Sequence, residues 1–142
     1  MRISDVLTSK PGEVVTIHPD ATVRELHGLL AQHNIGAVVV SADGGAVDGI
    51  VSERDIVRRL AESDAVLDGA VSEIMTSDVQ TCEPGAPLDD LRKLMTERRI
   101  RHVPVITDGK LTGIISIGDV VKSSIVQLEF ERDQLDSYVH QT

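Results

Sequence analysis

The chain has 142 residues, of which 41% are apolar and 26% charged, and this balance predicts a globular fold. A formal net charge of −9 disfavours binding to nucleic acid or to anionic membranes, because both need clustered Lys and Arg. No apolar run approaches the roughly 20 residues of a membrane span. We therefore expect a cytoplasmic protein, in which the single cysteine, Cys82, is a small apolar filler of a strand.

The first half of the chain predicts a helix, two strands and a second helix. Thr22 can cap the first helix, whose apolar residues follow helical spacing, and AVVVS at 37–41 is a β-branched run typical of a buried strand. In chain order we expect a helix over 22–34, a strand over 37–41, a turn at Gly44 and Gly45, a strand over 47–51 and a helix over 52–60.

The second half predicts the same order of elements. We expect a helix opened by Pro87 and Leu88, a strand over 103–107, a turn at Asp108 and Gly109, a strand over 111–115 and a helix that begins at Ser116 and runs to the end of the chain.

The two halves are one sequence repeat. TIHPDATVREL at 16–26 aligns with TCEPGAPLDDL 65 positions later, and GIVSERDIV at 49–57 aligns with GIISIGDVV 64 positions later. The segments before the repeats also agree, since VLTS at 6–9 resembles IMTS at 74–77. Neither repeat could bury much surface alone, so we expect their sheets to pack together with pseudo-twofold symmetry.

The predicted fold is therefore α/β (α+β), with two β-α-β-β-α repeats and a long C-terminal helix. The expected boundaries are a first repeat with its N-terminal lead-in at 1–62, an acidic linker at 63–70, a second repeat at 71–124 and a helical extension at 125–142.

A pattern G-h-h-S-x-x-D closes each repeat, at 49–55 and at 113–119. It places a hydroxyl and a carboxylate at the start of a helix, where backbone N–H groups can hold phosphate and the Asp can accept both hydroxyls of a ribose. The same spacing is also a capping box, in which Asp accepts a hydrogen bond from the N–H of the capping Ser. Spacing alone favours the capping box and leaves the nucleotide interpretation open.

Several motifs occur together in both halves and favour the nucleotide interpretation. They are IHP at 17–19 and CEP at 82–84, IGAVVV at 35–40 and IRHVPV at 100–105, and GIVSERD and GIISIGD. With them, residues 3–125 resemble a tandem CBS-domain pair, or Bateman module, of the stand-alone bacterial type. The resemblance implies an adenine nucleoside phosphate in a cleft between the halves. Ser52 and Asp55 would serve one site, and Ser116 and Asp119 the other.

The resemblance also implies where the rest of the ligand would lie. Adenine is expected near the strand starts, at Val15, Thr16, Val79 and Thr81, against Ile35, Val38, Ile100 and Val103. Lys10 precedes the first strand start and joins the candidate set, as does Pro104, which also shapes its strand edge.

The phosphate-contacting positions differ between the halves. The second half has Arg99, Arg101 and His102 where the first has Asn34, Gly36 and Ala37, and conversely Arg54 corresponds to Gly118. Basic residues in an acidic protein favour an anionic ligand, so we expect two unequal sites. Alternatively, Arg98 to Arg101 are a solvated helix end favoured by the helix dipole.

The C-terminal helix carries an apolar stripe. Val121, Ile125, Leu128, Leu135 and Val139 follow alternating steps of four and three, with Arg132 in the one skipped position. This spacing is the seam of a two-helix contact, which could be filled by a partner or by the chain's own body. Because CBS pairs commonly dimerise, the resemblance favours a homodimer.

The leading hypothesis is a sensor that binds an adenine nucleotide, AMP before ATP, ADP or NAD, and alters an unidentified effector protein in trans. No Ser-His-Asp grouping, P-loop, GxGxxG or metal-ligand spacing supports catalysis, a metal or a catalytic cofactor. Three alternatives stay open: an NAD sensor of the same fold, a protein-interaction module with vestigial sites, and an enzyme subunit that needs a catalytic partner chain.

Overall fold

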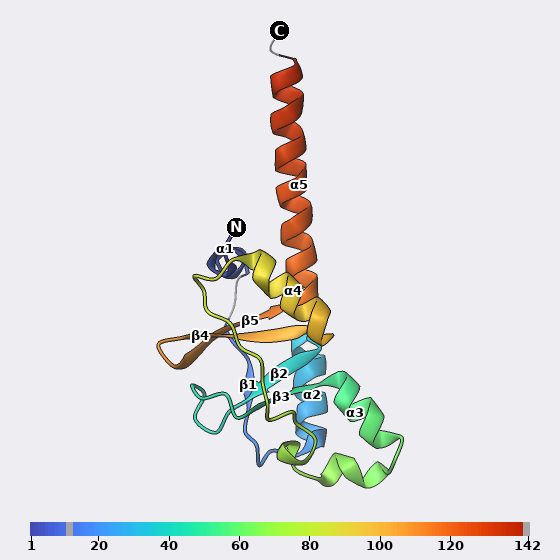
Figure 1. Cartoon of the computed structure of the whole chain (residues 1–142). Coiled ribbons are helices and arrows are strands. Elements are labelled where there is room, and N and C mark those ends of the chain that lie inside the picture. Colours follow the sequence, from blue (N-terminus) through green and yellow to red (C-terminus); the bar gives the residue numbers. More distant parts are fainter. Residues whose placement is uncertain (11–12, 141–142) are drawn as a thin grey trace. The chain divides into compact units, whose positions relative to one another are not determined.

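The computed structural model describes residues 1–10 and 13–140. It is a mixed α/β fold, which confirms the predicted class (Figure 1). Its elements are α1 (Ile3–Ser9), β1 (Thr16–Ile17), α2 (Val23–His33), β2 (Ala37–Val40), β3 (Gly49–Ser52), α3 (Glu53–Leu60), the 3-10 helices η1 (Asp64–Asp68) and η2 (Val71–Glu73), α4 (Leu88–Arg98), β4 (His102–Thr107), β5 (Lys110–Ser116) and α5 (Ile117–Val139).

The chain divides into two compact units. Unit 1 comprises Met1–Pro11, Pro84–His102 and Ile115–Thr142, and unit 2 comprises Gly12–Glu83 and Val103–Ile114. The division does not follow the sequence repeats, because unit 1 combines the N-terminal lead-in with helices of the second repeat.

Unit 2 contains the three-stranded sheet β1-β2-β3. β1 runs parallel to β2 with Ile17 opposite Val40, and β2 runs antiparallel to β3 with Ala37 opposite Ser52. All four residues of the central strand β2 are buried, as expected for a β-branched strand covered on both faces. The main core gathers side chains from this sheet, α2, α3 and η2.

The helix ends follow the sequence closely. The Thr22 hydroxyl accepts a hydrogen bond from the Glu25 N–H, which begins α2 as predicted. α2 ends at Asn34 and α4 ends at Arg99, both with a left-handed backbone at φ of 52° and 53°. β3 begins at Gly49, two residues later than expected, because the preceding loop bends back and the Asp48 carboxylate accepts the Ala42 N–H.

Hydrogen bonds confirm that the two halves are structural repeats. Ser41 N–H donates to the Ile17 carbonyl over 2.9 Å, and Ile106 N–H donates to the Cys82 carbonyl over the same distance. Each pair lies at the offset of 65 that the sequence alignment gave. The second repeat reduces its first strand to a single parallel bridge between Cys82 and Val105.

Each repeat is completed by the lead-in of the other repeat. In unit 1, Ile3 N–H donates to the Ala86 carbonyl, and Leu88 N–H donates to the Met1 carbonyl, both over 3.0 Å. In unit 2 the matching bonds run from Val71 N–H to the Ala21 carbonyl and from Val23 N–H to the Gly69 carbonyl, over 2.8 and 3.0 Å. The lead-ins are therefore exchanged, which the repeat pattern did not reveal.

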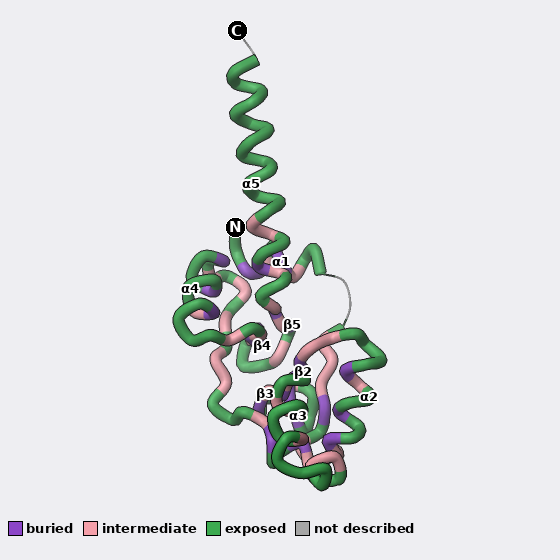
Figure 2. The backbone as a smooth tube through the Cα atoms, turned by 90° about the vertical axis from the view of Figure 1, so that its right-hand side faces the viewer, coloured by how far each residue is buried: buried purple, intermediate pink, exposed green. Residues whose placement is uncertain are grey.

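Within unit 1, the first turns of α5 pack against α4 and α1 (Figure 1). The buried apolar residues of unit 1 are Ile3, Val6, Leu88, Leu91, Met95, Ile115 and Val120. Beyond this contact α5 projects away from α1 and α4 and is exposed (Figure 2). No helix in residues 1–10 and 13–140 is long and apolar enough to span a bilayer.

The segment predicted as a linker, 63–70, is folded. It forms η1, whose Val66 and Leu67 pack against the core of unit 2, and Asp68 lies 3.2 Å from the Arg24 guanidinium. The boundaries drawn from the sequence repeat stay a prediction.

Candidate functional site

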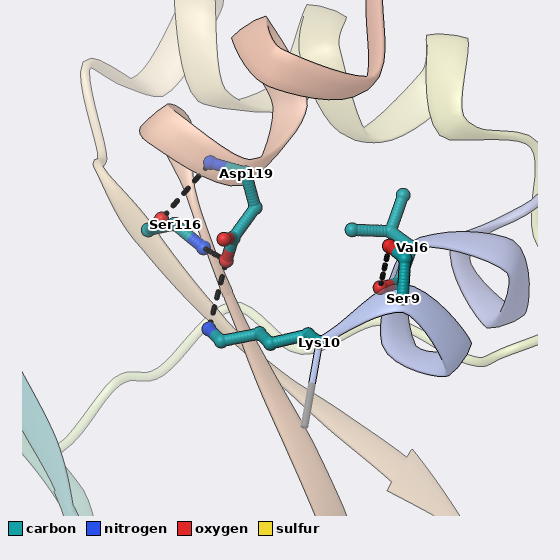
Figure 3. Close-up of polar contacts among 5 residues, drawn as sticks. All are labelled: Val6, Ser9, Lys10, Ser116 and Asp119. Carbon is teal, nitrogen blue, oxygen red and sulfur yellow. Dashed lines mark hydrogen bonds and ion pairs between the residues drawn. The ribbon is translucent and has the colours of Figure 1, made fainter. Parts of the chain in front are cut away.

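The first candidate site lies in unit 1, where β5 ends and α5 begins. Here the Ser116 hydroxyl accepts a hydrogen bond from the Asp119 N–H over 3.1 Å, and Asp119 Oδ2 accepts one from the Ser116 N–H over 2.9 Å. The S-x-x-D pattern therefore forms the capping box that its spacing favoured (Figure 3).

Lys10 also reaches this carboxylate. Its ammonium lies 2.8 Å from Asp119 Oδ2, so Oδ2 receives both bonds and Oδ1 receives none from the described residues (Figure 3). Partial burial opposes ionisation of Asp119, but the Lys10 ammonium and the Ser116 N–H outweigh it and lower the pKa of this carboxyl below 3.8. Asp119 is thus an ionised carboxylate with one oxygen open.

Arg101 is brought to the same helix start by its backbone. The Ile117 N–H, first in α5, donates to the Arg101 carbonyl over 2.8 Å. The side chain of Arg101 is exposed and that of His102 is half-buried. We call Lys10, Arg101, His102, Ser116 and Asp119 the Asp119 cluster; it joins a carboxylate, a hydroxyl and the Lys10 ammonium at one helix N-terminus, with the backbone of Arg101 bonded to the same turn.

The second candidate site lies in unit 2 and repeats this backbone geometry. Asp55 Oδ2 accepts hydrogen bonds from the Ser52 N–H and hydroxyl over 2.8 and 3.1 Å, and the Ser52 hydroxyl accepts the Asp55 N–H over 3.3 Å. The Glu53 N–H donates to the Gly36 carbonyl over 2.9 Å, as Ile117 does to Arg101. We call Gly36, Ser52, Arg54 and Asp55 the Asp55 cluster.

The charges at the two clusters differ. Gly36 has no side chain where the Asp119 cluster has Arg101, and Arg54 follows its helix start where the other cluster has Gly118. Aligning VLTSK with IMTSD also places Asp78 at the position that corresponds to Lys10. The Asp119 cluster is therefore the more basic of the two.

Sequence reasoning gave no role to the second lead-in, which the structure places on the first repeat. Thr76 and Ile50 exchange two backbone hydrogen bonds of 2.9 Å. The approach is so close that a Cβ on Gly49 would lie 2.6 Å from the Met75 sulfur and 2.9 Å from the Thr76 carbonyl oxygen. The similarity of VLTS to IMTS was the signal that could have identified these residues.

The structure distributes the predicted site residues over both units. Unit 1 holds Lys10, Ile100, Arg101, His102, Ser116 and Asp119. Unit 2 holds Val15, Thr16, Ile35, Gly36, Ala37, Val38, Ser52, Arg54, Asp55, Val79, Thr81, Val103 and Pro104. Val38 and Val103 are core residues with exposed fractions of 1% and 0%, whereas Val15, Thr16, Ile35 and Val79 are half-buried and Thr81 is exposed.

In the described part of the chain, neither the Cys82 thiol nor a group of metal ligands indicates a further reactive site. Burial raises the pKa of the Cys82 thiol to about 11, so this residue is mostly a neutral thiol at pH 7. Among residues 1–10 and 13–140, no group of His, Cys, Asp and Glu is placed to hold a metal ion.

Comparison with known proteins identifies the family. The CBS domain model matches residues 3–62 and 71–125. The crystal structure of the CBS-domain protein ATU1752 from Agrobacterium tumefaciens is 47% identical with a TM-score of 0.83, over 87% of this chain and 99% of that one.

Two further similar structures contain ligands. The CBS domain protein PAE2072 from Pyrobaculum aerophilum, in complex with AMP, is 32% identical with a TM-score of 0.74, over 84% of this chain and 89% of that one. The CBS domain pair of MJ0100, in complex with 5-methylthioadenosine and S-adenosyl-L-methionine, is 25% identical with a TM-score of 0.79, over 89% of this chain and 98% of that one. The two matched segments, the shared fold and these identities show that the chain belongs to the CBS domain family, as a tandem pair.

Proposed function

We propose that this CBS pair is a regulatory module that binds an adenine nucleotide, AMP in first place, at the Asp119 cluster. It would act in the cytoplasm on an effector protein in trans, as a homodimer, and would catalyse no reaction itself. The observation that carries the proposal is the ionised Asp119 carboxylate, which lies beside the Lys10 ammonium at a helix N-terminus whose first N–H is bonded to the Arg101 carbonyl.

Each part of this cluster suits one part of the ligand. A carboxylate accepts hydrogen bonds from a ribose diol, and Asp119 has an oxygen available for that purpose. A phosphate would be stabilised by the positive end of the α5 dipole and by the Lys10 and Arg101 cations. The ligands named for PAE2072 and MJ0100 share an adenosine moiety, which supports this class of ligand.

Lys10 offers a route from the ligand to the rest of unit 1. Without ligand its ammonium neutralises Asp119, but an ammonium has three donors and can also bond a phosphate. Lys10 directly follows α1, and α1 packs against α5. A nucleotide that draws Lys10 toward its phosphate would therefore shift α1 against α5, and the effector would read that shift.

We propose that the Asp55 cluster is a weaker site. It keeps the carboxylate and the hydroxyl, but Gly36 and Asp78 occupy the positions of Arg101 and Lys10, so Arg54 alone supplies a cation there. A nucleoside without phosphate would lose less affinity at the Asp55 cluster, relative to the Asp119 cluster, than a nucleotide would.

A thermal-shift panel of AMP, ADP, ATP, NAD and S-adenosylmethionine tests the proposal. A ligand at a hundredfold excess over its dissociation constant adds about 2.7 kcal/mol of stability, which raises Tm by several degrees for a chain of this size. We expect AMP to give the largest shift, and Asp119→Ala to reduce it far more than the matched variant Asp55→Ala. If no compound moved the transition of the wild-type protein, the sensor function would be rejected.

A further inference from the structure

Beyond its first turns, α5 carries an exposed apolar stripe. Val121, Ile125, Leu128, Leu135 and Val139 have exposed fractions between 51% and 66%. Together with Arg132 they alternate at steps of four and three along the helix. We call these six positions the seam, because this spacing allows two helices to pack side by side.

A groove of about 310 Å³ lies at the base of the seam, entirely within unit 1. Leu88, Val120 and Leu128 form apolar walls, and Asp89 and Arg92 lie on its rim. Ser124, one position outside the seam, also lines the groove. This surface suits an aromatic ring with a polar tip.

We propose that α5 pairs antiparallel with α5 of a second copy, and that Tyr138 of each copy fills the groove of the other. In the register that uses the whole seam, Val121 faces Val139, Ile125 faces Leu135, and Leu128 faces Arg132. All six seam positions are then paired on both helices. This register is centred on residue 130, so each helix lies along the full exposed length of the other.

Charge selects the antiparallel orientation. In a parallel, in-register pair the Arg132 side chains would face each other in the seam, and Glu131 would come beside Asp136 of the other helix, five positions further along the flank. In the antiparallel pair Arg132 faces Leu128, and Lys122 comes beside Asp136 of the other helix on one flank of the seam. Glu129 and Glu131 each meet their own counterpart near the twofold axis, but the two Arg132 side chains lie in the seam between these acidic pairs and offset their repulsion.

The same register explains the exposed tyrosine. Tyr138 is the only tyrosine in the chain and 76% of it is exposed. In this register the residue directly opposite it is Lys122 of the other copy, and Ser124, which lines the groove, lies two positions further along on the same flank of the seam. Its ring can pack on Leu128 while its hydroxyl reaches the Arg92 or Asp89 rim. The register follows from the spacing of the seam, whereas the groove follows from the packing of α4 on α5. Because these are separate observations, the arrival of Tyr138 at the groove supports the antiparallel pairing.

This inference specifies the homodimer within the proposed function and does not require nucleotide binding. The first test is the dimer dissociation constant from sedimentation equilibrium. We expect Leu135→Glu to raise it more than tenfold and Tyr138→Ala to raise it about tenfold. The control Phe130→Glu changes an equally exposed side chain outside the seam and should leave it within twofold. A monomeric wild type, or equal effects of Leu135→Glu and Phe130→Glu, would overturn the assignment.

Orientation is measured with a spin label at residue 140, introduced as His140→Cys in a Cys82→Ser background. The antiparallel register sets residue 140 opposite residue 120, so the two labels are 20 residues apart along the axis, about 30 Å. A parallel pair would bring them to about 10 Å. The short distance would refute the antiparallel register. The dissociation constant and the spin-label distance report on the dimer alone. Nucleotide binding is measured separately, by the thermal-shift panel with the Asp119 variant.

Discussion

Alanine substitutions at the two cluster carboxylates separate a capping contribution from an ion pair. Asp119 and Asp55 both accept the N–H of their capping Ser, at 2.9 and 2.8 Å, so each substitution loses a similar cap, worth about 1 kcal/mol. Only Asp119 pairs with Lys10, and these side chains are 23% and 38% exposed, so solvent limits the pair to about 0.5–1 kcal/mol. Asp119→Ala should therefore cost about 1.5–2 kcal/mol and Asp55→Ala about 1 kcal/mol.

Urea denaturation at pH 7 measures this difference directly. Adding Lys10→Ala should remove the excess cost of Asp119→Ala and leave the cost of Asp55→Ala unchanged, since Lys10 pairs with Asp119 and not with Asp55. At 1 M salt the excess should shrink through screening. If Asp119→Ala and Asp55→Ala lowered the free energy of unfolding equally at low salt, the ion pair would add no stability and both carboxylates would act only as helix caps.

The same ion pair predicts the pH dependence. The folded-state pKa of Asp119 lies below its ordinary value of 3.8, so below that value the unfolded chain takes up the proton first. The stabilisation is therefore fully present above the unfolded pKa and is lost as pH falls through the folded pKa. In acid titrations, stability of Asp119→Ala should fall less steeply than that of the wild type in this range; parallel curves would contradict the assignment.

Three further predictions concern single residues. Gly49→Ala should destabilise by roughly 1–3 kcal/mol because its Cβ would lie 2.9 Å from the Thr76 backbone carbonyl oxygen as well as 2.6 Å from the Met75 sulfur. Gly118→Ala, whose nearest neighbour is 3.6 Å away in the first turn of α5, should be neutral or slightly stabilising because alanine favours a helix; equal urea midpoints would contradict this. Arg99→Gly should raise the free energy of unfolding by about 0.5–1 kcal/mol, since glycine adopts the left-handed φ of 53° without strain; a loss would count against it. Cys82, with a thiol pKa of about 11, should react with a disulfide reagent at pH 8 roughly 100-fold more slowly than a small thiol, and equal rates would show that the thiol is not buried.

The fold was largely predictable because local signals agreed with each other. The Thr22 and Ser52 caps, the β-branched 37–41 run and the offset of 65 each specified an element that the structure contains. The start of β3 was set two residues too early, because valine at 47 favours a strand while the Asp48 carboxylate holds a loop there.

The candidate site was only partly predictable. Sequence identified Lys10, Ser116 and Asp119 separately, and the spacing of Ser116 and Asp119 fixed their capping box. Lys10 contacts a carboxylate 109 positions away because the lead-ins are exchanged between the repeats. This exchange is made by hydrogen bonds between distant segments, and no local sequence pattern predicts it. The same exchange brings Thr76 to β3, and for this reason the second lead-in received no role from sequence alone.

Titration calorimetry of AMP into the wild-type protein and into Asp119→Ala shows whether the Asp119 carboxylate holds the nucleotide. We expect saturable binding to the wild type and at least a tenfold loss of affinity in Asp119→Ala, with Asp55→Ala close to the wild type. Wild-type affinity in a folded Asp119→Ala protein, or no AMP binding to the wild type at millimolar concentration, would contradict it.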